Sequence, residues 1–458
     1  MTTAVPHSPP SARDVLAPLP SALPPVAREA VIPAGFSAGG LAAGIKASGR
    51  PDLAVIVATG GPAAAAAVFT PNAFAAAPVL RSRAALAATG GWVRAVVSTS
   101  GCANAATGPA GDADQRRVGQ LVADALGVGV DEVLHLSTGI IGTRLPLDRV
   151  AAGIDALAPT LAATNDGLEA AAIALRTTDS TTKVATVELA LTGSDGTSHR
   201  VTVSGMAKGV GMIHPRMATM LSVVLTDATA SPELLASILR PAAARTWNQL
   251  SVDGDTSTND TVLLLASGAK DAATVLSGSP AAAALAAAVE AVARDLARQQ
   301  AADGEGATCL LTCQVSGAAT DADARAVARA VISSSLVKAA AHGKDPNWGR
   351  IAGAAGNARL ADAAVLVAAG MDAAEAASRA GSPATLDPSR LRIAIGGHLV
   401  FDGSAGGPQP FDRAAAREAM HAPEILIRLD LGLGQGSGEG FGCDLTEAYV
   451  IENAEYTT

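Results

Sequence analysis

The chain has 458 residues, which is enough for two or more domains and a large core. Only 2% of the residues are aromatic and 16% are charged, so we expect a core built from Ala, Val, Leu and Ile. The net charge of -9 argues against a surface for nucleic acid or for an anionic membrane, and leaves a small polar ligand open.

The N-terminal residues 1–30 are rich in Pro, Ala and Ser and lack the basic start and apolar core of a signal peptide. They are expected to form a flexible tail. The uncharged residues 60–80 are interrupted by prolines and indicate strand and loop rather than a membrane span. The expected compartment is therefore the cytoplasm.

The cysteines and histidines do not indicate a disulfide framework or a metal site. The cysteines are too few and too scattered for a disulfide framework: Cys102, Cys309, Cys313 and Cys443. We expect them to be buried or reduced thiols. The seven histidines show no ligand spacing, so no metal site is predicted.

In the first part of the chain, strands are expected at 52–58, 67–70 and 93–98, and a helix at 112–126. A further strand from 133 runs into Ser137-Thr138-Gly139. Such a turn can aim a hydroxyl and a backbone N–H at one point, as an oxyanion requires, although the tripeptide also occurs in ordinary turns. Residues 184–191 and 201–203 flank a polar turn and predict a β-hairpin.

The hairpin leads into residues 208–221, a glycine-rich loop followed by a strand over 220–227. Gly209 and Gly211 let the backbone turn and let other atoms approach closely. Thr219 lies where the loop meets the strand, which is a suitable place for a nucleophile.

Beyond this strand, helices are expected to begin at Ser231-Pro232 and at Ser279-Pro280, where a cap residue precedes a proline. A polar run at 253–261 and an acidic turn at 303–308 precede apolar strands, helices follow at 321–332 and 372–380, and 342–350 is expected to be an irregular loop. Because strands and helices are interspersed without a repeat or a clean linker, the fold class is α/β or α+β.

Several of these stretches together resemble the ornithine acetyltransferase family, the bifunctional glutamate N-acetyltransferases of arginine biosynthesis. The matching stretches run from about residue 34 to the end of the chain: Gly35-Phe36, 43–46, 68–70, 137–139, 208–221, 251–261, 303–308, 345–351 and 442–458. The resemblance implies that the precursor cuts itself between Ala218 and Thr219. It also implies an αββα sandwich formed jointly by an α chain (31–218) and a β chain (219–458), which pair into an α2β2 heterotetramer.

The resemblance further implies that acetyl transfer from N2-acetylornithine to glutamate proceeds by a ping-pong mechanism through an acyl-enzyme. Thr219 would be the nucleophile, and Thr138 and Gly139 would form the oxyanion hole. The residues implied to bind substrate are Thr177, Lys208, Thr219, Glu305, Asn453 and Thr458. No cofactor is implied, and acetyl-CoA remains open as a second acetyl donor.

This chemistry suits the residue types. Cleavage would free the α-amine of Thr219, which titrates at about 7.7–8.0 and can act as general base for its own hydroxyl. Arg216 stands where Asn is usual in the family, and the N-terminal tail has no counterpart there.

Three other functions remain open. The first is an aminopeptidase-like hydrolase that uses water as the final acceptor, although the Glu305 turn and the Asn453 to Thr458 terminus favour the transferase. The second is a secondary-metabolism paralogue with another acyl acceptor. The third is a catalytically dead binding protein, against which the intact Ala218-Thr219 pair argues.

Overall fold

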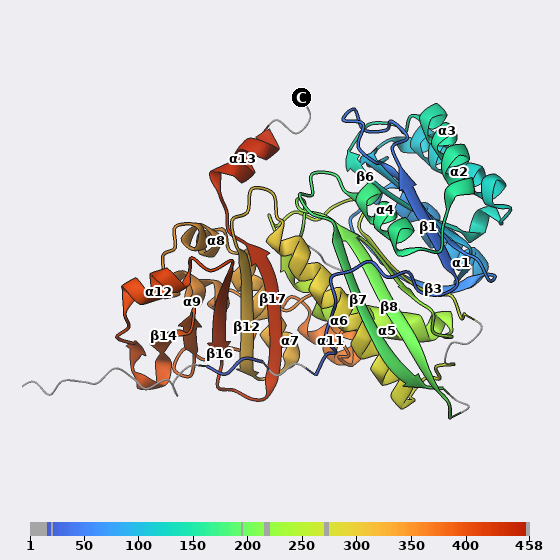
Figure 1. Ribbon diagram of the computed structural model, residues 1–458. Helices are drawn as coiled ribbons and strands as arrows, with labels where there is room; N and C mark the ends of the chain where they lie inside the picture. Colours follow the sequence, from blue (N-terminus) through green and yellow to red (C-terminus); the bar gives the residue numbers. More distant parts are fainter. Residues whose placement is uncertain (1–15, 20–21, 194–195, 215–219, 270–273, 455–458) are drawn as a thin grey trace, which may run out of the picture. The chain divides into compact units, whose positions relative to one another are not determined.

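The computed structural model describes residues 16–19, 22–193, 196–214, 220–269 and 274–454 (Figure 1). These residues form two compact units. Unit 1 contains Thr308–Leu360 and Gly381–Thr446, and unit 2 contains the described residues from 22 to 307, with Ala361–Ala380 and 447–454. Residues on both sides of the 218/219 bond therefore contribute to unit 2.

The first sheet of unit 2 has the order β1-β2-β5-β6. Its strands are β1 (Phe36–Leu41), β2 (Leu53–Ala58), β5 (Ala95–Cys102) and β6 (Val133–Ile140). The β1–β2 and β2–β5 pairs are antiparallel, whereas β5 and β6 are parallel. The strand predicted at 52–58 is confirmed, and the one predicted at 93–98 is divided between β4 (Trp92–Val93) and β5.

The second sheet of unit 2 has the order β4-β3-β11-β9-β8-β7. Its other strands are β3 (Ala63–Phe69), β7 (Lys183–Thr192), β8 (Ser198–Lys208), β9 (Leu221–Thr226) and β11 (Thr261–Ala266). The predicted hairpin is confirmed as β7 and β8, the long pair of green strands in Figure 1. Every residue of β9 is buried, as its continuous apolar run predicts for a strand inside a sheet.

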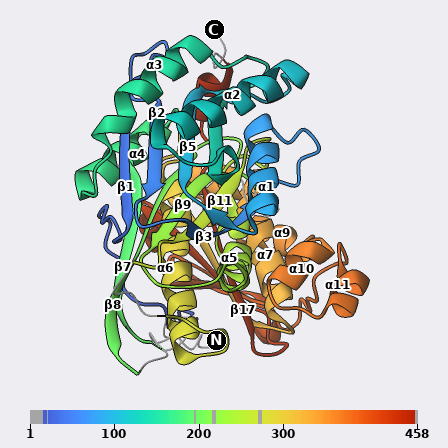
Figure 2. The ribbon, with the colours of Figure 1, turned by 90° about the vertical axis from the view of Figure 1, so that its right-hand side faces the viewer.

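Helices cover the outer faces of both sheets (Figures 1 and 2). On the first sheet, Val118 of α2 (Gly108–Leu126) and Ile154 of α3 (Leu147–Leu157) share a core with Val55 of β2. On the second sheet, Val292 and Leu296 of α6 (Pro280–Ala302) lie against Gly205 of β8. The remaining helices of unit 2 are α1 (Ala77–Thr89), α4 (Asn165–Leu175), α5 (Pro232–Arg245), α10 (Ala363–Ala368), α11 (Ala373–Arg379) and α13 (Glu447–Ala454).

A second apolar core fills the space between the two sheets. It joins Ile56 of the first sheet to Val223 and Leu263 of the second, with Leu168 of α4 packed among them. Successive side chains of a strand point to opposite faces of its sheet. On β2, Val55 therefore packs into the core under α2 and α3, and Ile56 into the core between the two sheets. Unit 2 is thus an αββα sandwich, and the mixed α/β class is confirmed.

The sheet strands of unit 1 are neighbours in the order β17-β12-β16-β13-β14-β15. Its strands are β12 (Leu310–Ala318), β13 (Arg392–Ile395), β14 (His398–Asp402), β15 (Gly407–Pro408), β16 (Glu424–Asp430) and β17 (Gly436–Cys443). Its helices are α7 (Asp321–Ser333), α8 (Ser335–His342), α9 (Trp348–Gly356) and α12 (Arg413–Ala419). The predicted helix at 321–332 is confirmed, with the Thr320 side chain capping its N-terminus.

Two sequence-based expectations need correction. Residues 60–80 hold not only β3 but also the start of α1, whose Pro78 lies in the first helical turn, where proline is tolerated. The loop expected at 342–350 ends early, because the Asn347 side chain accepts a hydrogen bond from Arg350 N and α9 begins at Trp348.

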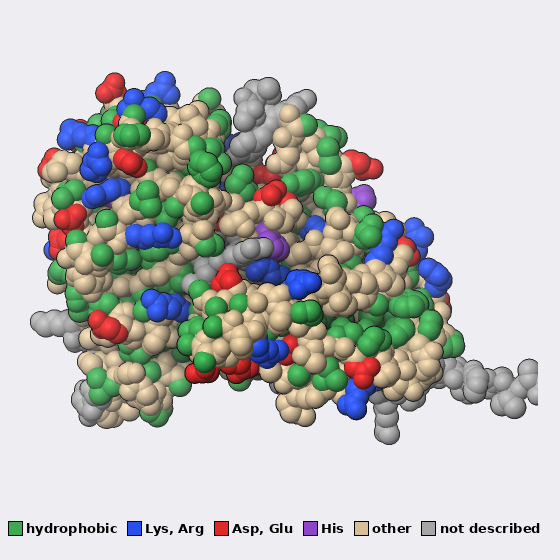
Figure 3. All heavy atoms as spheres, turned by 180° about the vertical axis from the view of Figure 1, so that it is seen from behind, with side chains coloured by type: hydrophobic (Ala, Val, Ile, Leu, Met, Phe, Trp, Pro, Cys, Tyr) green, Lys and Arg blue, Asp and Glu red, His purple; other side chains and the backbone are tan. Residues whose placement is uncertain are grey.

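The structure also bears on the expectations about the cysteines, the N-terminal segment and membrane spans. The four cysteines are free and buried. Within the segment expected to be a tail, Ala27 pairs with Thr186 and Arg28 forms an ion pair with Asp295 at 3.0 Å. Among the described residues, no helix combines the length and apolarity needed to cross a membrane. On the face in Figure 3, basic and acidic side chains are interspersed among apolar ones.

Candidate active site

Unit 2 contains a cavity of about 390 Å³ that brings together residues from distant parts of the chain. Its lining includes every described residue that the sequence analysis placed in the catalytic or substrate site: Thr138, Gly139, Thr177, Lys208, Glu305 and Asn453. Met220, the residue bonded to Thr219, also lines it. Ala218, Thr219 and Thr458 lie outside the described residues, as does Arg216.

Thr138 and Gly139 belong to β6 itself rather than to a turn after it. Gly139 has φ +128°, and a Cβ there would lie 2.3 Å from the carbonyl carbon of Gly101 on the adjacent β5. Only glycine fits this backbone and this close approach. Ser137, the residue before Thr138, is held from the segment that leads into β11, because the Asn259 side-chain amide donates to Ser137 O at 2.8 Å.

Lys208 ends β8 and is only 8% exposed. Its Nζ lies 3.3 Å from Thr138 Oγ1, within hydrogen-bond distance. Its backbone carbonyl accepts a hydrogen bond from Gln300 Nε2 of α6 at 2.8 Å. Burial lowers the pKa of Lys208, and the negative charge of Asp179 opposes that shift.

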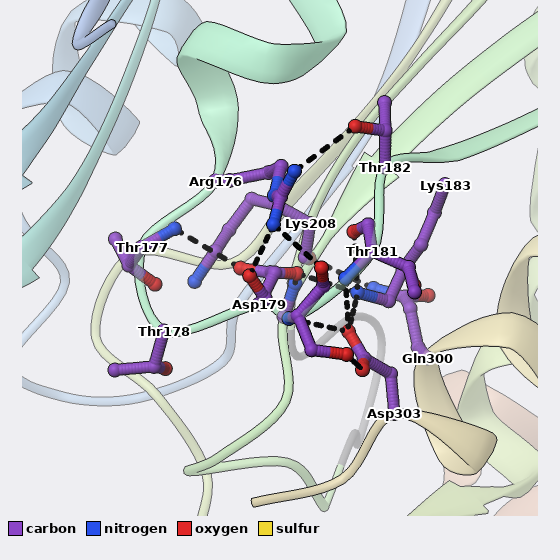
Figure 4. A network of polar contacts seen from close by, with 12 residues as sticks. Arg176, Thr177, Thr178, Asp179, Thr181, Thr182, Lys183, Lys208, Gln300 and Asp303 are labelled. Atoms are coloured by element: carbon purple, nitrogen blue, oxygen red, sulfur yellow. Dashed lines mark hydrogen bonds and ion pairs between the residues drawn. The ribbon is translucent and has the colours of Figure 1, made fainter. Parts of the chain in front are cut away.

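Asp179 is the buried centre of the polar network in Figure 4. One carboxylate oxygen accepts hydrogen bonds from Lys183 Nζ at 2.7 Å and from Gly209 N at 2.8 Å. The other accepts from Thr177 N at 3.0 Å. Burial by itself would raise the pKa of Asp179, but the charges of Lys208 and Lys183 and the Gly209 N–H hold it well below its usual range.

The same network reaches the acidic turn at 303–308. Lys183 Nζ, bound to Asp179, also lies 2.5 Å from Asp303 Oδ2, and Asp303 accepts a hydrogen bond from Ser180 N at 3.0 Å. The loop between α4 and β7 is therefore tied to the turn that carries Glu305. This loop thus links Gly209, the residue after Lys208, to the turn that carries Glu305.

Glu305 is held on both carboxylate oxygens. Thr178 Oγ1 donates to Oε1 at 2.8 Å, and Asn453 Nδ2 donates to Oε2 at 3.0 Å. Gly211 lies so close that a Cβ there would be 2.2 Å from Oε2. A carboxylate has about four lone-pair sites, so this held Glu305 can still accept hydrogen bonds from a cationic ligand.

Thr177 and Thr178 both line the cavity, but they differ in their contacts. Thr177 reaches Asp179 through its backbone N–H, whereas the hydroxyl of Thr178 binds Glu305. The residue expected from the sequence is Thr177, whereas the hydroxyl that contacts Glu305 belongs to Thr178. Two adjacent threonines give no sequence signal that could distinguish these roles.

Two further cavity residues, Asn259 and Asp260, were not selected from the sequence. Asp260 is 2% exposed, and its Oδ2 has no hydrogen-bond partner among the described residues. Burial raises the pKa of Asp260 well above its usual value. Their position in the sequence could have indicated them, because Asn259 and Asp260 immediately precede β11. That strand begins beside the start of β9, where Thr261 N donates to Met220 O at 2.9 Å.

The cavity thus combines one buried ammonium, one held carboxylate, a hydroxyl and a glycine N–H beside the start of β9. These groups suit a zwitterionic ligand and a carbonyl that develops negative charge. Among the described residues, no group of three or more His, Cys, Asp or Glu side chains is arranged to hold a metal ion.

Comparison with known proteins gives a consistent set of relatives. The sequence model of the ArgJ family matches residues 37–458. The Arginine biosynthesis bifunctional protein ArgJ of Thermus thermophilus is 46% identical over 427 residues, which is 93% of this chain and 99% of that protein. Its counterpart in Parasynechococcus marenigrum is 42% identical over 426 residues, which is 93% of this chain and 94% of that protein.

Solved structures of related proteins also match. The ornithine acetyltransferase complexed with ornithine from Mycobacterium tuberculosis is 44% identical, with a TM-score of 0.38 over 42% of this chain and 97% of that chain. The arginine biosynthesis bifunctional protein ArgJ from Bacillus halodurans is 37% identical, with a TM-score of 0.44 over 52% of this chain and 99% of that chain.

Proposed function

Because the chain belongs to the ArgJ family, we propose that it is a glutamate N-acetyltransferase that moves the acetyl group of N2-acetylornithine to glutamate. The observation that carries the proposal is the cavity of unit 2. Residues from β6, the loop before β7, β8, the acidic turn and α13 meet in it beside the residue that follows Thr219.

The charges of the cavity support this substrate class. N2-acetylornithine carries a carboxylate, an acetamide and a side-chain ammonium. The Glu305 carboxylate suits the ammonium, and the Lys208 ammonium adds positive charge to the same cavity. A volume of about 390 Å³ lies within the range of small-molecule sites.

The nucleophile is made by self-cleavage. The Thr219 hydroxyl attacks the carbonyl carbon of Ala218, the C–N bond breaks, and the acyl group moves from nitrogen to oxygen. Water then hydrolyses the resulting ester, which leaves an Ala218 carboxylate, a free Thr219 α-amine and a free hydroxyl. This amine takes the hydroxyl proton during turnover.

The sheet supports a cut at this position. Strand β8, before the cut, pairs with β9, after it, from Val203↔Thr226 to Lys208↔Leu221. Strand β9 also pairs with β11 on its other side. The strands before and after the cut therefore belong to one hydrogen-bonded sheet, and cleavage does not require the two chains to separate.

Turnover follows a ping-pong order. Thr219 takes the acetyl group from N2-acetylornithine, ornithine leaves, and the amine of glutamate attacks the acetyl ester. Thr138 Oγ1 and Gly139 N stabilise the oxyanion in both halves; losing one such donor typically slows a reaction by roughly 10²–10³-fold. Thr177, Asn453 and Thr458 complete the substrate site in this proposal.

We also propose how the enzyme assembles and where it acts. The α and β chains pair into an α2β2 heterotetramer that acts in the cytoplasm and needs no cofactor. A separate assay supplies acetyl-CoA and glutamate without N2-acetylornithine. Formation of N-acetylglutamate would show that acetyl-CoA is a second acetyl donor, and no product would restrict the enzyme to N2-acetylornithine.

A direct assay separates the transferase from the aminopeptidase-like hydrolase. Purified enzyme is given N2-acetylornithine with or without glutamate, and N-acetylglutamate and free acetate are measured. Glutamate-dependent formation of N-acetylglutamate supports the transferase. Release of acetate at the same rate with and without glutamate, together with cleavage of short peptides, would instead assign the hydrolase.

A further inference from the structure

We propose that Lys208 is a positioning residue that orients the Thr138 hydroxyl, so that its hydrogen points into the cavity as an oxyanion donor. The inference rests on the proposed function, because it assigns Lys208 a task within the same site. The central observation is the distance of 3.3 Å between Lys208 Nζ and Thr138 Oγ1.

The direction of this hydrogen bond follows from the two groups. A lysine ammonium has three donors and no acceptor, whereas a hydroxyl has one donor and two acceptor lone pairs. Lys208 therefore donates and Thr138 accepts. The hydrogen of Thr138 is left for another acceptor, and both residues line the same cavity.

The surroundings of Lys208 fix its ammonium near Thr138. Lys208 is 8% exposed and ends β8, where Gln300 of α6 binds its carbonyl at 2.8 Å. The following residue, Gly209, donates its N–H to Asp179 Oδ1 at 2.8 Å. Burial lowers the pKa of the Lys208 amine, whereas the negative charge of Asp179 acts in the opposite direction and favours the charged, donor-only form.

A charged donor behind Thr138 has a second effect. The Lys208 ammonium withdraws electron density from the Thr138 oxygen, so the Thr138 hydroxyl becomes a stronger donor towards the reacting carbonyl. Negative charge develops there only in the transition state. The positioning role therefore predicts a loss of kcat, whereas binding of a substrate carboxylate predicts a rise in KM.

The test is a double-mutant cycle between positions 208 and 138. Wild type, Lys208→Met, Thr138→Val and the double variant are purified, and kcat and KM for N2-acetylornithine are measured for each. Rates are normalised to the self-cleaved fraction, which is determined by intact mass spectrometry, and the thermal unfolding midpoint checks folding.

The expected result is non-additivity in kcat. Lys208→Met should lower kcat by roughly 10- to 100-fold, by analogy with the loss on removing outer-shell residues that orient metal ligands. In the Thr138→Val background the same change should alter kcat by less than about 2-fold, because the hydroxyl on which Lys208 acts is gone. If Lys208→Met does not fold, Lys208→Gln keeps a polar side chain and replaces it in the cycle.

An equal loss of kcat in both backgrounds would overturn the positioning role, as would a change confined to KM. Failure of the proposed function has a different signature. If wild type transfers no acetyl group to glutamate, the activity is wrong. If Thr138→Val retains full kcat in an active enzyme, the assignment of Thr138 as oxyanion donor is wrong.

Discussion

Asn453 Nδ2 donates a hydrogen bond to Glu305 Oε2 at 3.0 Å, across 148 residues of sequence. Thr178 Oγ1 binds the other oxygen of the same carboxylate at 2.8 Å. Helix α13 and the loop before β7 therefore fix the acidic side of the cavity together. A carboxylate held in this way meets a cationic substrate with little loss of side-chain entropy.

Replacing Glu305 by Gln should weaken substrate binding. The change keeps the size of the side chain but removes the charge that pairs with the substrate ammonium. Hydrogen bonds to charged groups contribute about 1.5–3 kcal/mol, so KM for N2-acetylornithine should rise by roughly 10- to 100-fold. Steady-state kinetics measures this, and Asn453→Ala, which leaves the Glu305 charge in place, should give a smaller rise. An unchanged KM in Glu305→Gln would remove Glu305 from the substrate site.

Replacing Gly211 by Ala should displace the same carboxylate without touching its chemistry. The new Cβ would stand 2.2 Å from Glu305 Oε2, well inside any real contact, so the Glu305 side chain must move. We expect an increased KM with a self-cleaved, folded protein. Gly353→Ala in α9 is the matched control, since a Cβ there meets nothing within 4 Å and alanine favours a helix. Equal kinetics of the two variants would refute the packing argument.

Asp179→Asn should destabilise the enzyme in a pH-dependent manner. Its folded pKa lies below the unfolded value of 3.8, so Asp179 contributes stability above about pH 4, and that contribution is lost as the pH falls through the folded pKa. Removing one partner of a buried ion pair costs about 3–5 kcal/mol. Urea unfolding should show a large difference between Asp179→Asn and wild type at pH 7 and a smaller one at pH 3.

Asp260→Asn is a control that should change the free energy of unfolding at pH 7 in the opposite direction. The folded pKa of Asp260 is raised, so its stabilising contribution is present below the unfolded value of 3.8 and is lost as the pH rises through the folded pKa. Asp260→Asn should therefore stabilise the protein at pH 7 and have little effect near pH 4. If both variants respond to pH in the same direction, the charges assigned to this region are wrong.

The sequence was most informative where local physics decides the structure. The apolar runs at 220–227 and 262–265 predict buried strands, and both are confirmed, as β9 (Leu221–Thr226) and β11 (Thr261–Ala266). Ser231-Pro232 and Ser279-Pro280 predict helix starts, and the side chains of both serines cap α5 and α6. These signals need only neighbouring residues.

The contacts between residues within the site could not be predicted from neighbouring residues in the sequence. Lys208 meets Thr138 because β8 of one sheet ends opposite β6 of the other, and Asn453 meets Glu305 only when α13 lies beside the acidic turn. Such contacts depend on how sheets and helices pack. The residue set itself came from the resemblance to a family, and the structure gathers its described members around one cavity.

The most direct test of self-cleavage and of the acetyl-enzyme is intact mass spectrometry of the enzyme after brief exposure to N2-acetylornithine without glutamate. We predict two chains separated between Ala218 and Thr219, with one acetyl group added to the chain that begins at Thr219 and removed again by glutamate. Thr219→Ala should remain a single, inactive and unacetylated chain. An uncut wild type that transfers acetyl groups, or acetylation of Thr219→Ala, would contradict the mechanism.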